Sequence, residues 1–249
     1  LRMAAVLAEG VTEIEGAACE PEVVDLANFL GKLGARIEGA GTPRIVVEGV
    51  ERLGGATHTV IPDRIEAGTF LVAGAICGDG VTLDRVEPAH LAAVIAALAK
   101  SGYPIEESPG RLRILPNGES RPLNLTTEPY PGFPTDMQAQ MCALLSTTRG
   151  VSVVTEHVFP QRFMHVAELN RMGASIELEG ATAVLNGVDS LSGAPVMASD
   201  LRASAALLLA ALKAEGSTEI NRVYHIDRGY EMIDDKLAQL GARIERVKA

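Results

Sequence analysis

The sequence predicts an α/β protein built from a repeated unit of roughly 70 residues, with apolar helices inside and β-sheets outside. A motif that ends a helix and begins a strand occurs four times, and its glycines lie 68, 71 and 68 residues apart: Gly34, Gly102, Gly173 and Gly241. A second set of glycines, each preceding a β-rich stretch, is spaced by 70, 70 and 66 residues: Gly10, Gly80, Gly150 and Gly216. Two independent markers with one period indicate an internal repeat. One helix of each unit is also apolar nearly all round, as expected for a helix buried on every side.

Each unit is expected to contain the same elements in the same order. The apolar helices are predicted at 2–9, 66–76, 136–146 and 200–214. A strand follows each of them, and then an amphipathic helix, at 21–33, 88–101, 161–172 and 227–240. A glycine ends each amphipathic helix, as is common at a left-handed cap. Next come a strand containing Ile-Glu and a second strand such as 43–50, 111–116 or 181–188. A last strand leads into the next unit's apolar helix.

The two ends of the chain interrupt this pattern. The first unit lacks the strand and turn that should precede its opening helix, and the last unit stops at Ala249 before its closing strands. The chain also begins with Leu1. We therefore expect a fragment whose final sheet takes strands from elsewhere.

Composition narrows the class of protein. The chain has 249 residues, 47% of them hydrophobic, and a net charge of -10, which argues against general binding to nucleic acid or to an anionic membrane. The longest apolar run, 203–212, is shorter than the ~20 residues of a membrane span. Three cysteines without paired spacing favour a reducing compartment, and so the cytoplasm. The five histidines show no metal-ligand spacing, and no glycine-rich phosphate loop occurs.

Arginines stand where four helices are predicted to begin: Arg64, Arg162, Arg202 and Arg228. A cation in the first turn of a helix is disfavoured by about 0.3–1 kcal/mol, because the helix N-terminus is itself partly positive. A bound anion would reverse that effect, since backbone amides and guanidinium groups would both face it. The alternative is that the arginines pair with nearby carboxylates, because surface pairs are common. Four such arginines in one repeat architecture favour an anion site.

Asp136 raises a related question. It stands in the stretch FPTDMQAQ, residues 133–140, at the start of an apolar helix. An aspartate there is an ordinary helix cap. The other possibility is that its carboxylate takes part in chemistry beyond the helix start.

Five stretches resemble the UDP-N-acetylglucosamine 1-carboxyvinyltransferase family: 20–55, 133–140, 162–169, 187–210 and 224–247. The resemblance implies transfer of enolpyruvyl from phosphoenolpyruvate to the 3'-hydroxyl of UDP-N-acetylglucosamine, the first committed step of peptidoglycan synthesis. The reaction is an addition followed by an elimination that releases phosphate, without metal or organic cofactor. The implied fold is two domains, each an inside-out α/β barrel of three repeats. These two small molecules are the expected partners.

The resemblance also implies roles for individual residues. Asp136 matches a carboxylate that contacts the sugar 3'-hydroxyl and serves as its general base, and Val158 matches a main-chain contact to the nucleotide sugar. Arg228 matches an arginine that meets phosphoenolpyruvate, with Arg162 and Arg202 as charged neighbours. The remaining matches lie in the cleft between the domains: Asp63 and Arg64 near the hinge, the pair Glu20 and Glu22, and Asp200.

One family feature is missing. No cysteine of this chain matches the family's loop cysteine, which acts as the general acid, so we expect the chain alone to be inactive. Residues 1–62 would be the last repeat of one domain, and 63–249 most of the other. A shikimate-pathway enolpyruvyl transferase (3-phosphoshikimate 1-carboxyvinyltransferase) is the nearest alternative, although FPTDMQAQ and ASDLRASA favour the nucleotide-sugar enzyme. Two hypotheses from different classes are a non-catalytic remnant and a purely structural repeat protein.

Overall fold

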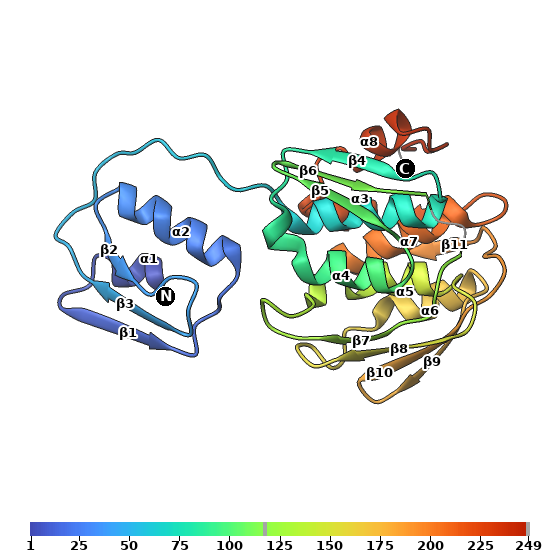
Figure 1. The fold of residues 1–249 in the computed structure, drawn as a ribbon, viewed down its shortest axis with the longest axis horizontal. Coiled ribbons are helices and arrows are strands. Elements are labelled where there is room, and N and C mark those ends of the chain that lie inside the picture. Colours follow the sequence, from blue (N-terminus) through green and yellow to red (C-terminus); the bar gives the residue numbers. More distant parts are fainter. Residues whose placement is uncertain (117–118, 248–249) are drawn as a thin grey trace. The chain divides into compact units, whose positions relative to one another are not determined.

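The computed structural model describes residues 1–116 and 119–247, and it divides into two compact units (Figure 1). The first unit comprises Leu1–Asp63 with Pro129–Gly132, and the second comprises Arg64–Glu128 with Phe133–Ala249.

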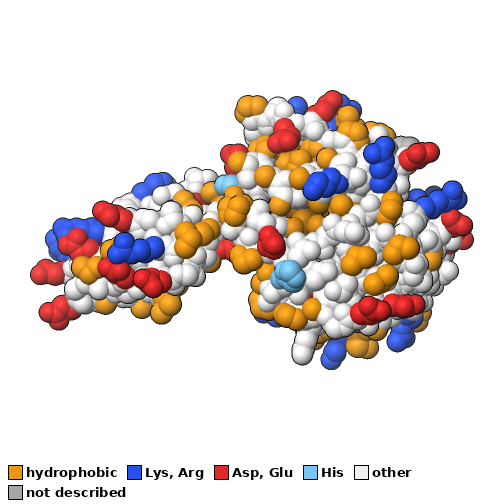
Figure 2. Space-filling model, turned by 60° about the horizontal axis from the view of Figure 1, so that its bottom comes forward, with side chains coloured by type: hydrophobic (Ala, Val, Ile, Leu, Met, Phe, Trp, Pro, Cys, Tyr) orange, Lys and Arg blue, Asp and Glu red, His pale blue; other side chains and the backbone are white. Residues whose placement is uncertain are grey.

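The first unit is a small sheet with two helices. Its strands β1 (Val11–Glu15), β3 (Arg44–Glu48) and β2 (Arg36–Glu38) lie in that order and are antiparallel. The helices are α1 (Arg2–Ala5), which is shorter than the predicted apolar helix, and α2 (Pro21–Lys32). Leu30 of α2 packs in a core with Ile45 and Val47 of β3. Acidic and basic side chains are mixed on the face of this unit that Figure 2 shows. Between β3 and β1, Arg44 pairs with Glu13 at 2.8 Å.

The strand expected at the end of the first unit does not form. Residues 50–63 carry no strand, and His58 from this segment is held on one face of α2. Its Nε2 lies 2.9 Å from Asp25, its Nδ1 lies 3.1 Å from the ammonium of Lys32, and its ring lies 5.3 Å from that of Phe29. These three partners share a helix face because they are spaced by four and three residues. Side-chain contacts with a helix thus replace the expected strand.

Three apolar helices form the centre of the second unit: α3 (Arg64–Cys77), α5 (Gln138–Leu145) and α7 (Leu201–Lys213). They contact one another, and every residue of α5 is buried, as are residues 65–76 of α3 apart from Glu66. Gly68 of α3 leaves room for the side chain of Met137 just before α5, since a Cβ at Gly68 would lie 2.9 Å from the Met137 sulfur. The prediction that the apolar helices lie inside is therefore confirmed.

Sheets and amphipathic helices surround this centre (Figure 1). The first sheet is antiparallel, in the order β4 (Val81–Asp84), β6 (Arg111–Ile114), β5 (Ile105–Ser108). In the second sheet, β7 (Asn124–Thr127) is parallel to β8 (Val151–Glu156), followed by β10 (Thr182–Asn186) and β9 (Ser175–Glu179). The third has β11 (Pro195–Met197) parallel to β12 (Glu219–Asn221). Alternating burial along β6 and β10 shows which face of each sheet meets the helices.

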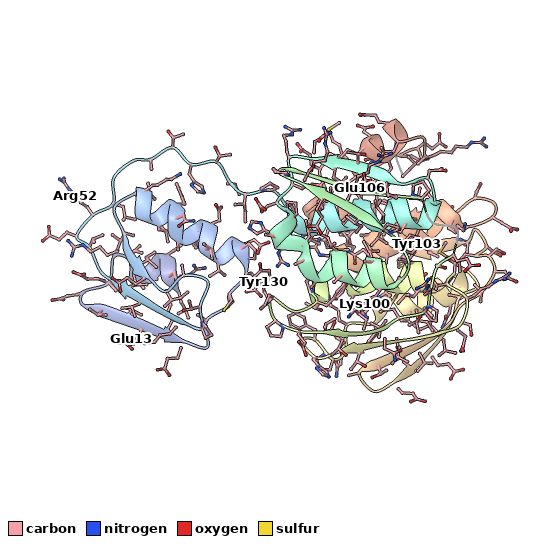
Figure 3. All side chains as sticks on the ribbon, viewed as in Figure 1. Glu13, Arg52, Lys100, Tyr103, Glu106 and Tyr130 are labelled. Atoms are coloured by element: carbon pink, nitrogen blue, oxygen red, sulfur yellow. The ribbon has the colours of Figure 1, made fainter. Side chains whose placement is uncertain are left out.

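The outer helices are α4 (Ala92–Lys100), α6 (Met164–Arg171) and α8 (Ile233–Gln239). A 3-10 turn, η1 (Pro88–Leu91), precedes α4. In Figure 3, Lys100 and Tyr103 mark the end of α4 and Glu106 marks β5, as the helix-then-strand motif predicts.

The last repeat differs from the prediction in two ways. The helix expected at 227–240 is divided into a 3-10 helix, η3 (Val223–Arg228), and α8, because Met232 adopts a left-handed φ of 48° between them. The strand expected at 243–247 is not formed, and this stretch pairs with no strand among the described residues.

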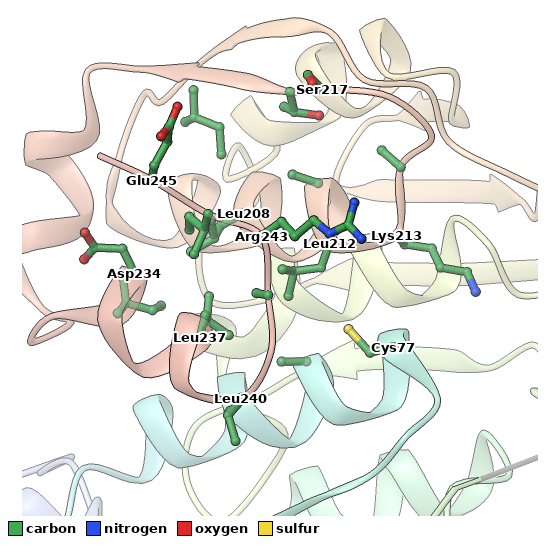
Figure 4. Close-up of a pocket in the computed structure, with 18 of the residues that line it drawn as sticks. Cys77, Leu208, Leu212, Lys213, Ser217, Asp234, Leu237, Leu240, Arg243 and Glu245 are labelled. Atoms are coloured by element: carbon green, nitrogen blue, oxygen red, sulfur yellow. The ribbon is translucent and has the colours of Figure 1, made fainter. Parts of the chain in front are cut away.

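A cavity of about 1730 Å³ opens in the same repeat (Figure 4). Leu208 and Leu212 of α7 line it together with Leu237 of α8 and Cys77 at the end of α3. This cavity therefore lies beside the two-stranded sheet of β11 and β12, the smallest of the three sheets described for the second unit.

Candidate functional site

The carboxylate of Asp136 lies between two arginines of the second unit. Oδ1 accepts a hydrogen bond of 2.6 Å from Nη1 of Arg162, and Oδ2 accepts one of 2.9 Å from Nη2 of Arg202. Asp136 belongs to a 3-10 turn, η2 (Thr135–Met137), which leads into α5, and no side chain caps either helix. Of the two possibilities for Asp136, the structure therefore excludes the helix cap.

Three different elements bring these side chains together. Arg162 precedes α6 by two residues, and Arg202 is the second residue of α7. Asp200 caps α7, because its Oδ1 accepts the backbone N–H groups of Arg202 at 2.8 Å and Ala203 at 3.0 Å. Asp200 thus fixes the helix start from which Arg202 projects.

The site is partly open, and its two arginines share the carboxylate of Asp136. The side chains of Asp136, Arg162 and Arg202 are 37%, 24% and 12% exposed. Burial opposes ionisation of Asp136, but the charge and hydrogen bonds of Arg202 and then of Arg162 outweigh it, and they hold its pKa below the ordinary value. One carboxylate and two guanidinium groups leave a formal charge of +1. The remaining N–H groups can therefore hold an anion.

Arg202 also touches a polar group that the sequence analysis missed. Its Nη1 lies 3.3 Å from the hydroxyl of Tyr230, which in turn lies 2.9 Å from Thr69 and 3.3 Å from Gln140. Thr69 and Gln140 are polar residues within the apolar helices α3 and α5. That interruption of an apolar pattern is the signal that could have found them.

A second buried carboxylate, Glu156, organises the turn that carries Val158. It ends β8, and its oxygens accept hydrogen bonds from the N–H groups of Val158 at 2.8 Å and Phe159 at 2.9 Å and from the hydroxyls of Thr127 and Thr135. Thr135 accepts a bond of 3.2 Å from Arg162, which links this turn to the arginine site. The N–H of Val158 is thus already bonded, so a main-chain contact from this residue to a ligand would use its carbonyl.

The prediction of arginines at helix starts is partly wrong. Arg64 and Arg202 do lie in the first turn of α3 and α7, whereas Arg162 precedes α6. Arg228 is exposed at the C-terminal end of η3, five residues before α8, because the predicted helix is divided there. Pairing with neighbours does not explain the clustered pair either, since Arg202 bonds to Asp136, 66 residues away.

The other predicted carboxylates lie in the first unit. Glu20 precedes α2 without capping it, and one of its oxygens is buried with no hydrogen-bond partner among the described residues. Glu22 lies in the first turn of α2, and Asp63 is the last residue before the second unit. Within the second unit, the structure brings Asp136, Arg162 and Arg202 together, with Asp200 behind them.

Over the described residues, no helix is long and apolar enough to cross a membrane. Within the same part of the chain, no three His, Cys, Asp or Glu residues are grouped closely enough to hold a metal ion.

Comparison with known proteins identifies the family of this chain. The profile of a family described as EPSP synthase (3-phosphoshikimate 1-carboxyvinyltransferase) matches residues 1–237. A UDP-N-acetylglucosamine 1-carboxyvinyltransferase from Akkermansia muciniphila is 64% identical over 249 residues, which cover 99% of this chain and 59% of that protein. UDP-N-acetylglucosamine 1-carboxyvinyltransferase 1 from Caldanaerobacter subterraneus is 57% identical over 246 residues, with the same coverage. The chain thus spans about three fifths of the length of these relatives.

Solved structures give the same fold. The enolpyruvyl transferase NikO from Streptomyces tendae superposes with a TM-score of 0.86 at 27% identity, over 97% of this chain and 58% of that one. An EPSP synthase from Acinetobacter baumannii superposes with a TM-score of 0.75 over 99% of this chain and 60% of that one. At 19% identity, this second likeness shows the fold alone.

Proposed function

This chain belongs to the EPSP synthase family of carboxyvinyl transferases, and on that basis we propose that it is part of an enzyme that transfers enolpyruvyl from phosphoenolpyruvate to the 3'-hydroxyl of UDP-N-acetylglucosamine. Phosphate is the second product, and peptidoglycan synthesis is the process served. The observation that carries the proposal is the carboxylate of Asp136 held between Arg162 and Arg202. The names of relatives that are 57% and 64% identical support the choice of acceptor.

Asp136 is proposed as the group that receives the proton of the attacking hydroxyl. Its lowered pKa keeps it ionised near neutral pH, and each oxygen keeps a free lone pair after accepting one bond from an arginine. The hydroxyl oxygen would bond to C2 as the C2–C3 double bond opens. C3 would take a proton from a general acid, the role that the family resemblance gives to a loop cysteine with no match in this chain. The two arginines keep the carboxylate oriented, as a general base must be.

Arg162 and Arg202 are proposed to bind the donor's charge. Phosphoenolpyruvate carries a carboxylate and a phosphate, and guanidinium groups match both geometrically. In the elimination step, C3 returns a proton to the group that supplied it, the C2–C3 double bond forms again, and the C2–O bond breaks with its electron pair passing to the leaving phosphate. Fixed cations stabilise that charge without reorganising. Arg228, exposed at the end of η3, is proposed to meet the same donor.

The proposed cellular location is the cytoplasm. Cys19, Cys77 and Cys142 are all free, which suits a reducing compartment.

Val158 is proposed to contact the nucleotide sugar through its carbonyl. The residues proposed to line the substrate cleft are Glu20, Glu22, Asp63, Arg64 and Asp200.

The test is release of phosphate from phosphoenolpyruvate, with UDP-N-acetylglucosamine or shikimate 3-phosphate as acceptor. The protein should carry this chain extended to full length with the remaining residues of the Akkermansia muciniphila relative. We expect release with the nucleotide sugar, and a loss of roughly 10²–10⁴-fold in Asp136→Asn. The matched control is Asp189→Asn, because Asp189 also pairs with an arginine, Arg149, but on the surface.

Two results would contradict the proposal. Phosphate release with shikimate 3-phosphate alone would favour the shikimate-pathway reaction. A folded protein that is silent with both acceptors would favour a non-catalytic remnant.

A further inference from the structure

We propose that Tyr230 is a positioning residue that fixes the guanidinium of Arg202 for the donor anion. This inference rests on the proposed function for its ligand, and on geometry alone for its contacts. Tyr230 lies between η3 and α8 and is only 2% exposed. Its hydroxyl lies where the central helices α3, α5 and α7 approach one another, within hydrogen-bond distance of one residue from each.

The directions of these hydrogen bonds follow from donor chemistry. Arg202 has only donors, so its Nη1 donates to the oxygen of Tyr230 at 3.3 Å. The Nε2 of Gln140, also 3.3 Å from that oxygen, is a donor too, and it shares its two hydrogens with the carbonyl of Asp136 at 2.8 Å and Oγ1 of Thr69 at 3.2 Å. Because neither Arg202 nor this nitrogen can accept, the hydroxyl proton of Tyr230 goes to Oγ1 of Thr69 at 2.9 Å. Thr69 donates its own proton to the carbonyl of Ile65 at 2.8 Å. A directed chain therefore runs from Arg202 to the backbone of α3.

The ring of Tyr230 adds a second contact. The central carbon of the Arg202 guanidinium lies 5.6 Å from the ring centroid, within the range of a cation–π interaction. Arg202 is thus held by the ring, by the hydroxyl and by Asp136. A long arginine side chain loses much conformational freedom when it is fixed. Tyr230 removes part of that freedom before any anion arrives.

A purely structural role for Tyr230 predicts different results. If the hydroxyl only stabilised the core, Tyr230→Phe would lower stability without changing the guanidinium or the donor affinity of the folded protein. If it positions Arg202, the variant keeps the ring contact but releases one end of the guanidinium. Donor binding should then weaken, while later steps change less.

The experiment uses Tyr230→Phe in the full-length protein described above. We expect the KM for phosphoenolpyruvate to rise by about tenfold, as for loss of one hydrogen bond to a charged group, and kcat to change by less than about threefold. The side-chain Nη proton signals of Arg202 in NMR should be resolved in the parent protein and averaged in the variant. Tyr103→Phe is the matched control, because Tyr103 is also buried but lies beyond the end of α4 (Figure 3).

The two readouts separate the inference from the proposed function. Unchanged Arg202 signals and an unchanged KM in folded Tyr230→Phe would overturn the positioning role. If the parent protein shows no turnover, the proposed function fails, yet the Arg202 signals still decide the inference. Should Tyr230→Phe not fold, Thr69→Val takes its place, because it removes the acceptor of the Tyr230 proton. The same direction of change is expected there, and its absence would refute the chain of hydrogen bonds.

Discussion

Lowering the pH should destabilise the second unit through one buried histidine. His165 of α6 is 2% exposed, and its Nε2 has no hydrogen-bond partner among the described residues. Burial lowers its pKa to about 4, while the nearby charge of Asp200 opposes the shift and that of Arg162 adds to it. The folded protein therefore holds this imidazole in its neutral form.

The size of the effect follows from the two pKa values. An unfolded histidine titrates near pH 6.5, so between about pH 6.5 and 4 the unfolded chain binds a proton that the folded chain does not. Stability from this group is complete above that window, is lost as the pH falls through it, and changes no further below it. At pH 5 the loss is roughly 2 kcal/mol, a large part of an ordinary folding free energy of ~5–15 kcal/mol.

Urea unfolding at pH 7.5 and pH 5, followed by circular dichroism, measures this loss. The parent protein should lose about 2 kcal/mol more between the two pH values than His165→Gln does. His157→Gln is the matched control, because His157 is exposed and should leave the difference intact. An equal loss in the parent protein and in His165→Gln would refute the argument, because other groups would then carry the whole pH dependence.

Three further predictions concern single residues. Glu156→Ala should lower the free energy of unfolding by about 3 kcal/mol or more, because it leaves the N–H groups of its turn without acceptors. Glu156→Gln keeps one carbonyl oxygen and should lower it by less. Urea unfolding midpoints compare the two variants, and equal losses would contradict this role. Gly187→Ala should lower the free energy of unfolding by more than about 3 kcal/mol, because its Cβ would lie 1.7 Å from the carbonyl oxygen of Thr148. Thermal melting measures this loss, and an unchanged melting temperature would refute the close approach. Gly31→Ala, in α2 with open space around it, should instead gain about 0.5–1 kcal/mol, and a lowered melting temperature would contradict that.

Much of the architecture could be predicted because it depends on periodic patterns. Nearly continuous apolarity from 65 to 76 placed α3 in the centre, and alternation placed β6 and β10 outside. The division of the last amphipathic helix escaped prediction. It depends on the left-handed backbone of Met232, a residue that rarely adopts such a conformation.

The site was predicted less completely than the fold. Asp136 and Arg202 stood out because each lies at a helix start, but their pairing joins residues 66 positions apart. Tyr230 and Glu156 gave no signal of their own, because a buried polar group is recognised by its partners and those are set by the tertiary structure. Local patterns therefore identified the charged residues, and only the fold identified what orients them.

Two aspartates at matching positions of the internal repeat make different contacts. Asp136 and Asp200 both stand where a central helix begins, yet Asp200 turns back to its own helix while Asp136 reaches two arginines. The 3-10 turn at residues 135–137 begins its helix without a side-chain cap, and such a cap contributes about 0.5–2 kcal/mol elsewhere. Because the units are duplicated, the same position at a helix start occurs more than once in the chain, and its residues can have different roles. One copy, Asp200, caps its own helix, while the other, Asp136, leaves its helix without a cap and binds two arginines from other elements.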